Sequence, residues 1–367
     1  MIHHVTVLGT GKVGQLVGIL LQEAGFTVQG VDQRPRNDLP YEVIAADVTN
    51  TEALKKAFAG QDAVVSCLPY ALNIAVSDVA HACGIHYFDL TEDVPTTKHI
   101  RKLAETSKTV MAPQCGLAPG FIGIVGADLA KGFSKIRSIK LRVGALPQNP
   151  TGLMGYAFNW SPEGVVNEYL NDCEVIENGE YKWVSPLEWL ETIHINGRKL
   201  EAFTTSGGLG TMCETYLGKA ENIDYKTMRY PGHAALMNCF FHELLMREDR
   251  ELAGRILTNA KPPVNDDIVY VHASVEGIKD GQNWREEFVR GYLPQMVGKT
   301  RWRAISWTTA ASVTAVVEMV KNGDLPQKGF IKQEEIPFDK YLQTRTGRMF
   351  LQGDSLNATC QATRTAA

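Results

Sequence analysis

A glycine-rich hexapeptide is the segment of this chain whose residue types and spacing point most directly to chemistry. Gly9-Thr10-Gly11-Lys12-Val13-Gly14 follows a β-branched run at residues 4–8 and opens a helical pattern. In that context the first glycine permits a tight turn, the second lets the backbone approach a pyrophosphate, and the third lets helix and strand pack closely. The free N–H groups of the helix N-terminus would then bind the phosphates of a dinucleotide.

An acidic residue further along the chain bears on which dinucleotide the loop would hold. Asp32 lies 18 residues past Gly14, at the end of the second predicted strand, where a carboxylate can bind both ribose hydroxyls. A carboxylate there disfavours the 2′-phosphate of NADP, whereas Arg34 and Arg36 are of the type that binds it. The pattern predicts NAD, with NADP possible. The predicted cofactor-binding residues are Gly9, Thr10, Gly11, Lys12, Val13, Gly14, Asp32, Gln33, Arg34, Asp47, Val48, Cys67, Leu68, Pro69, Leu90, Thr91 and Gly116.

Acidic side chains follow the fifth predicted strand, in the run Asp89-Leu90-Thr91-Glu92-Asp93. Ligands of parallel sheets bind beyond the carboxyl ends of the strands, so these acids are placed to meet one. Glu92 and Asp93 are candidates to hold an ammonium group or to relay a proton. The alternative is that they cap the following helix.

A second unusual segment, Cys115-Gly116-Leu117-Ala118-Pro119-Gly120, follows the sixth predicted strand. Two glycines and a proline fix an uncommon backbone path there. Cys115 is a candidate nucleophile, but most cysteines are buried small hydrophobes, and no sequence neighbour favours a thiolate. We therefore predict a pocket wall first and a chemical role second.

Polar residues also gather in three segments of the second half of the chain: FNWSPEG (158–164), TTSGG (204–208) and YKTMRYPGH (225–233). Arg229 can hold a carboxylate through two parallel hydrogen bonds. His233 is the best-placed imidazole for acid–base chemistry, and its alternative is a packed side chain beside a helix start. No metal site is predicted, because His233 and His242 have no third ligand nearby. The predicted substrate-binding residues are Tyr70, Trp160, Ser161, Thr205, Ser206 and Tyr225.

The elements that must position these residues alternate regularly over the first 115 residues or so. Strands are predicted at 4–8, 27–31, 42–46, 63–68, 86–90 and 109–111, with helices at 12–24, 51–59, 73–83 and 100–107. This alternation is typical of an α/β fold with a doubly wound parallel sheet, the Rossmann type.

After Pro119-Gly120 the pattern changes to longer strands and hairpin turns, which predicts an inserted α+β domain on a mostly antiparallel sheet. Its clearest predicted helix is 234–247. The apolar helix predicted at 305–320 would pack back on the first domain. We therefore predict a discontinuous Rossmann domain at 1–121 and 303–350, a second domain at 122–302, and a poorly ordered tail at 351–367.

Composition excludes several protein classes. The 367 residues are 44% hydrophobic and 21% charged, and their net charge of -4 gives no electrostatic footprint for nucleic acid or an anionic membrane. No uninterrupted apolar run reaches the roughly 18 residues that a membrane span needs. Seven scattered cysteines with no CxxC pair favour reduced thiols. With no signal-peptide pattern at the N-terminus, these features predict a cytoplasmic protein.

Together these segments resemble the saccharopine dehydrogenase-like family, which includes saccharopine reductases, carboxynorspermidine dehydrogenases and lysine 6-dehydrogenases. The resemblance covers residues 1–350 and rests on GTGKVG, CGLAPG, FNWSPEG, LEAFTTSGG, YKTMRYPGH and the late apolar helix, in that order. It implies a Rossmann domain completed by the C-terminal part of the chain, an inserted catalytic domain and a homodimer. It also implies hydride transfer between a nicotinamide and the carbon of a C–N bond.

Two departures from the family pattern guide the choice of an amino-acid substrate. Saccharopine reductases carry an acid in the CGLDPG-like motif where this chain has Ala118, and a basic residue where it has Glu163. Both changes are more similar to lysine 6-dehydrogenases, whereas Cys115 is the residue of the reductases. The resemblance thus favours oxidation of the side-chain amine of L-lysine. The alternatives are a secondary-amine substrate, such as saccharopine or carboxynorspermidine, and a non-catalytic NAD(P)-binding regulator.

For amine oxidation, we predict a nicotinamide against Cys115 and Gly116, with Pro69 and Tyr70 beside its ring. Glu92 and Asp93 would hold the reacting ammonium and Arg229 the carboxylate. Trp160 would wall the pocket, and His233 would carry the proton.

Overall fold

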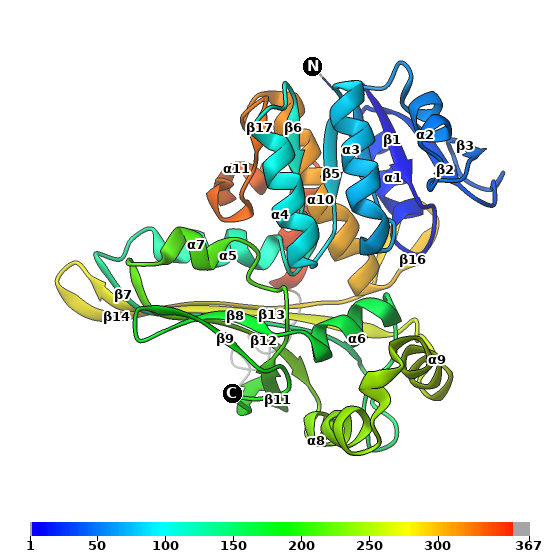
Figure 1. Cartoon of the computed structure of the whole chain (residues 1–367). Coiled ribbons are helices and arrows are strands. Elements are labelled where there is room, and N and C mark those ends of the chain that lie inside the picture. Colours follow the sequence, from blue (N-terminus) through cyan, green and yellow to red (C-terminus); the bar gives the residue numbers. More distant parts are fainter. Residues whose placement is uncertain (1, 355–367) are drawn as a thin grey trace, which may run out of the picture. The chain divides into compact units, whose positions relative to one another are not determined.

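The computed structural model describes residues 2–354, and these divide into two compact units (Figure 1). Of the described residues, the first unit comprises residues 2–124 together with Ser306–Met349, and the second comprises Val125–Ile305 with residues 350–354. Of the predicted tail, residues 355–367 lie outside the described part of the chain. The division falls within two helices, α5 (Phe121–Ala130) and α10 (Ala304–Asn322).

The first unit is built on a seven-stranded sheet in the order β17-β6-β5-β4-β1-β2-β3. Every neighbouring pair is parallel. The order reverses beside β1, which is the topological switch point at which ligands of such sheets bind. The strands are β1 (His4–Leu8), β2 (Thr27–Asp32), β3 (Glu42–Ala45), β4 (Ala63–Ser66), β5 (His86–Asp89), β6 (Val110–Ala112) and β17 (Gly329–Phe330).

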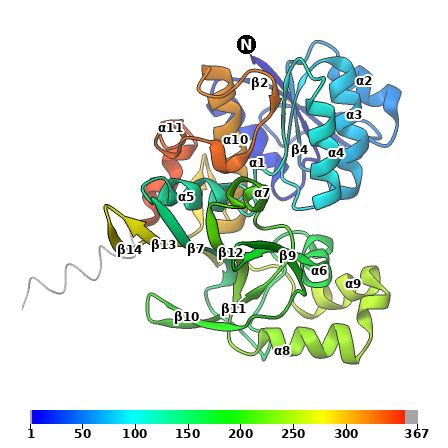
Figure 2. The same cartoon turned by 60° about the vertical axis from the view of Figure 1, so that its left-hand side comes forward.

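Helices cover both faces of this sheet, so the predicted Rossmann-type fold is confirmed. Helices α2 (Thr51–Phe58), α3 (Asn73–Cys83) and α4 (Val94–Ala104) pack side by side on one face, over a hydrophobic cluster that includes Leu54 and Val76. Helices α1 (Gly14–Glu23) and α10 lie on the opposite face (Figure 2). The shorter helical segments of this unit are η1 (Tyr70–Leu72), η4 (Gln333–Glu335) and α11 (Phe338–Tyr341).

Helix α4 begins earlier than predicted, at Val94 rather than residue 100. Asp93 caps it by accepting a hydrogen bond from the backbone N–H of Thr96 at 2.9 Å. Pro95 is tolerated in the first turn because that turn has no intrahelical partner for its N–H.

The second unit has an eight-stranded sheet in the order β10-β11-β12-β7-β13-β14, with β8 and β9 branching from β12. Its pairs are antiparallel except for β7 with β12, which run parallel. The strands are β7 (Lys135–Pro147), β8 (Cys173–Glu177), β9 (Glu180–Val184), β10 (Glu191–Ile195), β11 (Arg198–Thr204), β12 (Ala220–Arg229), β13 (Asp267–Lys279) and β14 (Gln282–Tyr292). A separate hairpin joins β15 (Gln295–Val297) to β16 (Thr300–Trp302).

Helices α6 (Pro162–Leu170), α8 (His233–Asn238) and α9 (Arg250–Ala260) pack on this sheet around one hydrophobic cluster, and α7 (Met212–Tyr216) precedes β12. The single helix predicted at 234–247 is wrong. Helix α8 ends at Asn238, a π-helical turn covers Cys239–Glu243, and Leu245 has a φ of +56°. A left-handed residue cannot continue an α-helix, which explains the break before the short turn Met246–Glu248. No helix among residues 2–354 meets the length and hydropathy of a membrane span.

Candidate functional site

The glycine loop between β1 and α1 fits a dinucleotide phosphate. A Cβ on Gly14 would lie 1.8 Å from the carbonyl oxygen of Gly9, so only glycine is possible there. A Cβ on Gly11 would meet no atom within 4 Å, which leaves the backbone open to a ligand. No side chain caps the N-terminus of α1, where Val13 is the cap residue. The N–H groups of Gln15 and Leu16 donate to the carbonyls of Gly11 and Val13, which leaves the N–H of Gly14 available to an anion.

Asp32 holds this loop in place. Its Oδ2 accepts hydrogen bonds from the backbone N–H and the hydroxyl of Thr10 at 2.8 and 3.0 Å, and its Oδ1 accepts one from the N–H of Arg34. Burial by itself would raise the pKa of Asp32, but the N–H groups of Arg34 and Thr10 outweigh it and lower the pKa. The Arg36 guanidinium forms an ion pair with Asp38 at 2.6 Å, which leaves Arg34 as the more exposed of the two arginines.

The other predicted cofactor residues line the same edge of the sheet to different degrees. A Cβ on Gly9 would lie 3.1 Å from both the carbonyl oxygen of Cys67 and the side chain of Leu68, so these two residues lie beside the glycine loop. The carboxylate of Asp47 instead forms hydrogen bonds within its own loop, where it accepts from the N–H and the hydroxyl of Thr49. Lys12, Gln33 and Pro69 are exposed, Leu90 is half-buried, and Val48 and Thr91 are buried.

Asp89 was not among the predicted site residues, yet it connects two of the predicted segments. Its buried Oδ1 accepts the N–H groups of Thr91 and Gln114, each at 3.0 Å, and its Oδ2 accepts the hydroxyl of Tyr87 at 2.7 Å. Burial raises the pKa of Asp89 to about 6, despite these hydrogen bonds. An acid at the carboxyl end of a buried strand is the sequence signal that marks it.

Glu92 and Asp93 differ in what their carboxylates do. Asp93 accepts hydrogen bonds from both the N–H and the hydroxyl of Thr96, at 2.9 and 2.6 Å, and therefore serves α4. Glu92 is half-buried, and burial, with smaller contributions from the charges of Asp93 and Asp89, raises its pKa to about 7. Of the two, Glu92 has the chemistry of a general base near neutral pH.

Residues 115–120 are braced by the C-terminal part of the chain. The hydroxyl of Ser312 on α10 donates to the carbonyl of Gly116 at 2.8 Å, and the Nε2 of Gln333 lies 3.3 Å from the Sγ of Cys115. Burial raises the pKa of the Cys115 thiol well above its ordinary value. A neutral, fully buried thiol is not a nucleophile, so this environment favours the pocket-wall interpretation.

In the second unit, Arg229 at the end of β12 is 2% exposed. Its Nε donates to the hydroxyl of Tyr169 at 2.9 Å, and its Nη1 donates to the hydroxyl of Thr227 and the carbonyl of Met228. The guanidinium also lies 4.6 Å from the ring centre of Tyr156. Among the described residues, Nη2 has no hydrogen-bond partner and no carboxylate lies within ion-pair distance of the guanidinium.

His233 lies on the other side of the same tyrosine. Its Nδ1 is 3.0 Å from the carbonyl of Met154 and its Nε2 is 3.1 Å from the hydroxyl of Tyr169. Burial and then the charge of Arg229 lower the pKa of His233 to about 3, so the ring is neutral. This geometry favours the packed-side-chain interpretation of His233. We call Arg229, Tyr169, His233, Tyr156 and Thr227 the Arg229 cluster.

Two further candidates of the second unit, Trp160 and Tyr225, interact with this cluster. Trp160 donates its indole N–H to the hydroxyl of Tyr156 at 3.2 Å. A Cβ on Gly208 would lie 2.2 Å from the buried ring of Tyr225, whose pKa is raised by burial and then by the charge of Glu168.

Three hydroxyl groups among these candidates have different roles. The hydroxyl of Ser206 donates to the carbonyl of Asp172, and Ser161 caps α6 through the N–H of Gly164. The hydroxyl of Thr205 is buried and has no hydrogen-bond partner in the described part of the chain, which leaves it available to a ligand.

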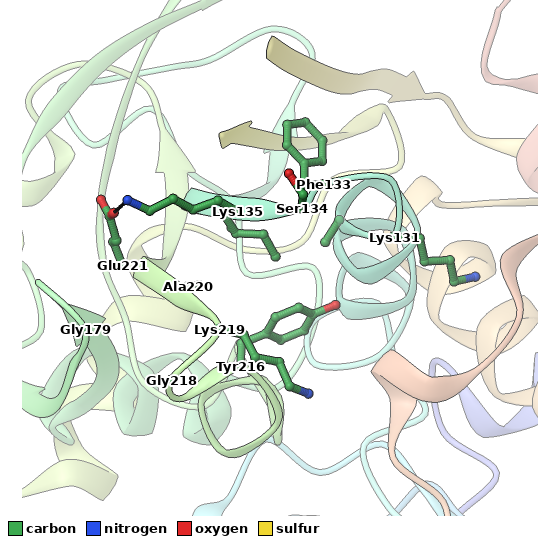
Figure 3. Close-up of a pocket in the computed structure, with 12 residues that line it drawn as sticks. Lys131, Phe133, Ser134, Lys135, Gly179, Tyr216, Gly218, Lys219, Ala220 and Glu221 are labelled. Atoms are coloured by element: carbon green, nitrogen blue, oxygen red, sulfur yellow. Dashed lines mark ion pairs between the residues drawn. The ribbon is translucent and has the colours of Figure 1, made fainter. Parts of the chain in front are cut away.

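A hollow of about 690 Å³ lies elsewhere in the second unit, at the start of β7 and β12 (Figure 3). Three lysines line it, and each has a partner: Lys135 pairs with Glu221 at 2.8 Å, Lys131 pairs with Asp128, and Lys219 lies over the ring of Tyr216. None of the predicted site residues lines this hollow. Among residues 2–354, no group of three or more His, Cys, Asp or Glu side chains is placed to hold a metal ion.

Several residues that support the candidates were not found from sequence, among them Asp89, Tyr169, Ser312 and Gln333. Tyr169 is separated by 60 residues from Arg229, and Ser312 by 196 residues from Gly116. No local pattern reports such distant partners. The buried serines and threonines of the apolar α10 were the one available sequence signal that this helix has a role beyond packing in a hydrophobic core.

Two family models match consecutive parts of the chain, and the second model spans residues of both units. Residues 5–114 match the model of the saccharopine dehydrogenase NADP binding domain, and residues 116–348 match the saccharopine dehydrogenase C-terminal domain. The NADP(+)-linked, L-glutamate-forming saccharopine dehydrogenase of Schizosaccharomyces pombe is 25% identical over 215 residues, which are 54% of this chain and 46% of that protein. The mitochondrial alpha-aminoadipic semialdehyde synthase of Bos taurus is 26% identical over 213 residues, 54% of this chain and 23% of that protein.

The chain thus matches less than half the length of these two curated relatives. Among solved structures, the apo saccharopine dehydrogenase (L-Glu forming) of Saccharomyces cerevisiae superposes with a TM-score of 0.72 at 17% identity, covering 94% of this chain and 97% of that one. This likeness shows a shared fold. The two domain models show an NAD(P)-binding domain at residues 5–114 and confirm the predicted resemblance: the chain belongs to the saccharopine dehydrogenase family.

Proposed function

We propose that this protein is an NAD(P)-dependent amino-acid dehydrogenase that oxidises the side-chain amine of L-lysine. The observation that carries the choice of substrate is Arg229, a buried guanidinium that has no carboxylate within ion-pair distance among the described residues, although the charge of Glu168 acts on it from further away. A buried charge needs a counter-charge, and the α-carboxylate of an amino acid supplies one. The unpartnered hydroxyl of Thr205 is a second polar group available to the substrate.

The number of cations favours a substrate with one carboxylate. Arg142, the other fully buried arginine of the second unit, is already paired with Glu191 and Asp224. A secondary amine such as saccharopine carries several carboxylates and needs more than one such clamp. Arg229 alone matches L-lysine, whose reacting amine is uncharged at the moment of oxidation.

Glu92 is the group that we propose takes the proton from the substrate ammonium. Its pKa of about 7 lets it exist as a carboxylate at and above neutral pH while still being basic enough to accept a proton. Asp89 acts on the same segment by fixing the N–H of Thr91. Cys115 remains a neutral thiol and forms part of the wall.

The loop Gly9–Gly14 would hold the pyrophosphate of the cofactor, and Asp32 would lie near its ribose. When bound, the nicotinamide supplies the chemistry of accepting a hydride from the carbon that bears the amine. The protein residues contribute binding, orientation and proton transfer. The homodimer and the cytoplasmic location implied by the sequence remain predictions.

Oxidation or formation of a secondary amine is the alternative favoured by a specific observation, because the S. pombe relative is named a saccharopine dehydrogenase. A non-catalytic NAD(P)-binding regulator is the second alternative, on the same fold.

One assay of the purified full chain distinguishes the three hypotheses. L-lysine, saccharopine and carboxynorspermidine are each offered with NAD and with NADP. Turnover of lysine, followed by the absorbance of the reduced cofactor, supports the proposal. Turnover of a secondary amine alone replaces it with the first alternative. Cofactor binding without turnover of any of the three amines contradicts the proposal and favours the regulator.

A further inference from the structure

Tyr169 occupies the centre of the Arg229 cluster and has no predicted role. Its side chain on α6 is fully buried, and its hydroxyl contacts Arg229 at 2.9 Å and His233 at 3.1 Å. Phe203 and Phe241 pack edge-on against its ring. The ring is therefore fixed, and so is the position of the hydroxyl.

The direction of each hydrogen bond in the cluster follows from chemistry. The carbonyl of Met154 can only accept, so the Nδ1 of His233 carries the ring proton and donates it. In a neutral imidazole the Nε2 is then an acceptor, and the hydroxyl of Tyr169 must donate to it. The tyrosine oxygen keeps its lone pairs for the Nε–H of Arg229. Each group in this series of hydrogen bonds, from Met154 to Arg229, is therefore defined as a donor or an acceptor.

These hydrogen bonds fix the orientation of the Arg229 guanidinium. Nε is held by Tyr169 and Nη1 by Thr227 and Met228, so the plane of the group is fixed and Nη2 is the part left for a ligand. Without the tyrosine oxygen the guanidinium would lose one of these anchors and could rotate about its last side-chain bonds. A planar donor recognises a carboxylate well only when it is held in the right orientation.

We infer that Tyr169, with its proton directed to the neutral His233, is a positioning residue that orients Arg229 for the carboxylate of the substrate. This inference rests on the proposed function, because it takes the Arg229 ligand to be the carboxylate of an amino acid. It predicts that the hydroxyl of Tyr169 matters only for substrates that carry this carboxylate.

The test compares the full-length parent with Tyr169→Phe, which keeps the ring and removes only the hydroxyl. The matched control is Tyr270→Phe, which removes a hydroxyl from another buried tyrosine of the same hydrophobic cluster. With L-lysine, Tyr169→Phe should raise KM roughly tenfold and change kcat less than about threefold, because a uniform binding contact is lost. Tyr270→Phe should leave both constants near the parent values.

A second substrate separates positioning from a general loss of structure. With 1,5-diaminopentane, which is lysine without its carboxylate, Tyr169→Phe and the parent should have the same kcat/KM. An equal loss of kcat/KM on both substrates would overturn the inference, since a merely structural role affects them alike. An unchanged KM for L-lysine would also overturn it.

Crystal structures of the parent and of Tyr169→Phe give a readout that needs no turnover. We expect the Arg229 guanidinium to leave its position in the variant, and an unmoved guanidinium would overturn the inference. If the parent oxidises no amine, the proposed function fails, but these two structures still decide whether Tyr169 orients Arg229.

Discussion

Two buried arginines lie on neighbouring strands of the second unit, Arg142 on β7 and Arg229 on β12. Their guanidinium groups have different kinds of partners. Arg142 has two carboxylate partners, Glu191 and Asp224, and Lys226 joins them through Glu191 at 3.0 Å. Arg229 has hydroxyl groups, a carbonyl and an aromatic ring instead, with Glu168 acting on its charge only at longer range. The first charge is paired with carboxylates in contact with it, whereas we propose that the second binds the carboxylate of a ligand.

The same contrast holds for two glutamates. Burial alone would raise the pKa of Glu191, but Arg142 and Lys226 outweigh it and lower the pKa to about 2. No cation contributes to the pKa of Glu92, which burial raises to about 7. A charge that the fold has satisfied is fixed over the physiological pH range, whereas one that it has not satisfied can bind or titrate.

Replacing Arg142, the arginine that is paired with carboxylates, should therefore have the largest effect, and that effect should be on stability. Arg142→Met leaves Asp224 without its ion-pair partner and Glu191 with Lys226 alone, so we expect the free energy of unfolding to fall by about 3–5 kcal/mol. Denaturant unfolding measures it. The triple variant Arg142→Met, Glu191→Gln, Asp224→Asn should recover much of the loss. A single variant as stable as the parent would mean that the pairing contributes little.

Replacing Glu92 should affect the rate instead. Because the pKa of Glu92 is about 7, the group is protonated below pH 7 and cannot accept a proton, so kcat/KM of the parent should fall about tenfold for each pH unit below 7. Glu92→Gln should lower kcat roughly 1000-fold at pH 8 and abolish this part of the pH profile. Asp93→Asn, at the helix cap, is the control and should keep the profile. A Glu92→Gln variant with the parent profile would remove Glu92 from proton transfer.

Replacing Arg229, which has no carboxylate within ion-pair distance, should affect substrate binding more than stability. In Arg229→Ala the amino acid loses its counter-charge, and we expect KM to rise roughly 100-fold while kcat changes only a few-fold. Steady-state kinetics with L-lysine measures both constants. The reverse pattern, a large fall in kcat with KM unchanged, would reject the carboxylate-clamp role.

The fold of the first unit was predictable because its signals are local. The strand at His4–Leu8 and the helix at Asn73–Cys83 have the predicted bounds, and Gly14 is required by a contact only five residues away. Each of these rests on hydrophobic period or on one tight turn. Errors arose where a cap moved a boundary, as Asp93 does for α4.

The candidate site of the second unit was only partly predictable, for the opposite reason. Arg229, Trp160 and Tyr225 were chosen by residue type, but the partners that define them, Tyr169 and Tyr156, come from distant segments. The polar run at residues 225–229 was not predicted as a strand, although it forms the end of β12. Pairing with β7 and β11 places it in the sheet, and tertiary pairing of this kind overrides a local polar pattern.

The smallest expected effect is on the choice of cofactor, and it depends on Asp32 in the first unit. Unlike Glu191, Asp32 has its negative charge stabilised by N–H groups and not by a cation. Its carboxylate stays ionised beside the ribose position because the hydrogen bonds from Arg34 and Thr10 lower its pKa. A fixed negative charge repels a 2′-phosphate, so the parent should prefer NAD, and Asp32→Ser should raise the ratio of kcat/KM for NADP over NAD roughly tenfold. Arg34→Ala in the Asp32→Ser background should reverse that gain, because Arg34 is the exposed cation left to bind the phosphate. A parent that already prefers NADP would show that the arginine outweighs the carboxylate.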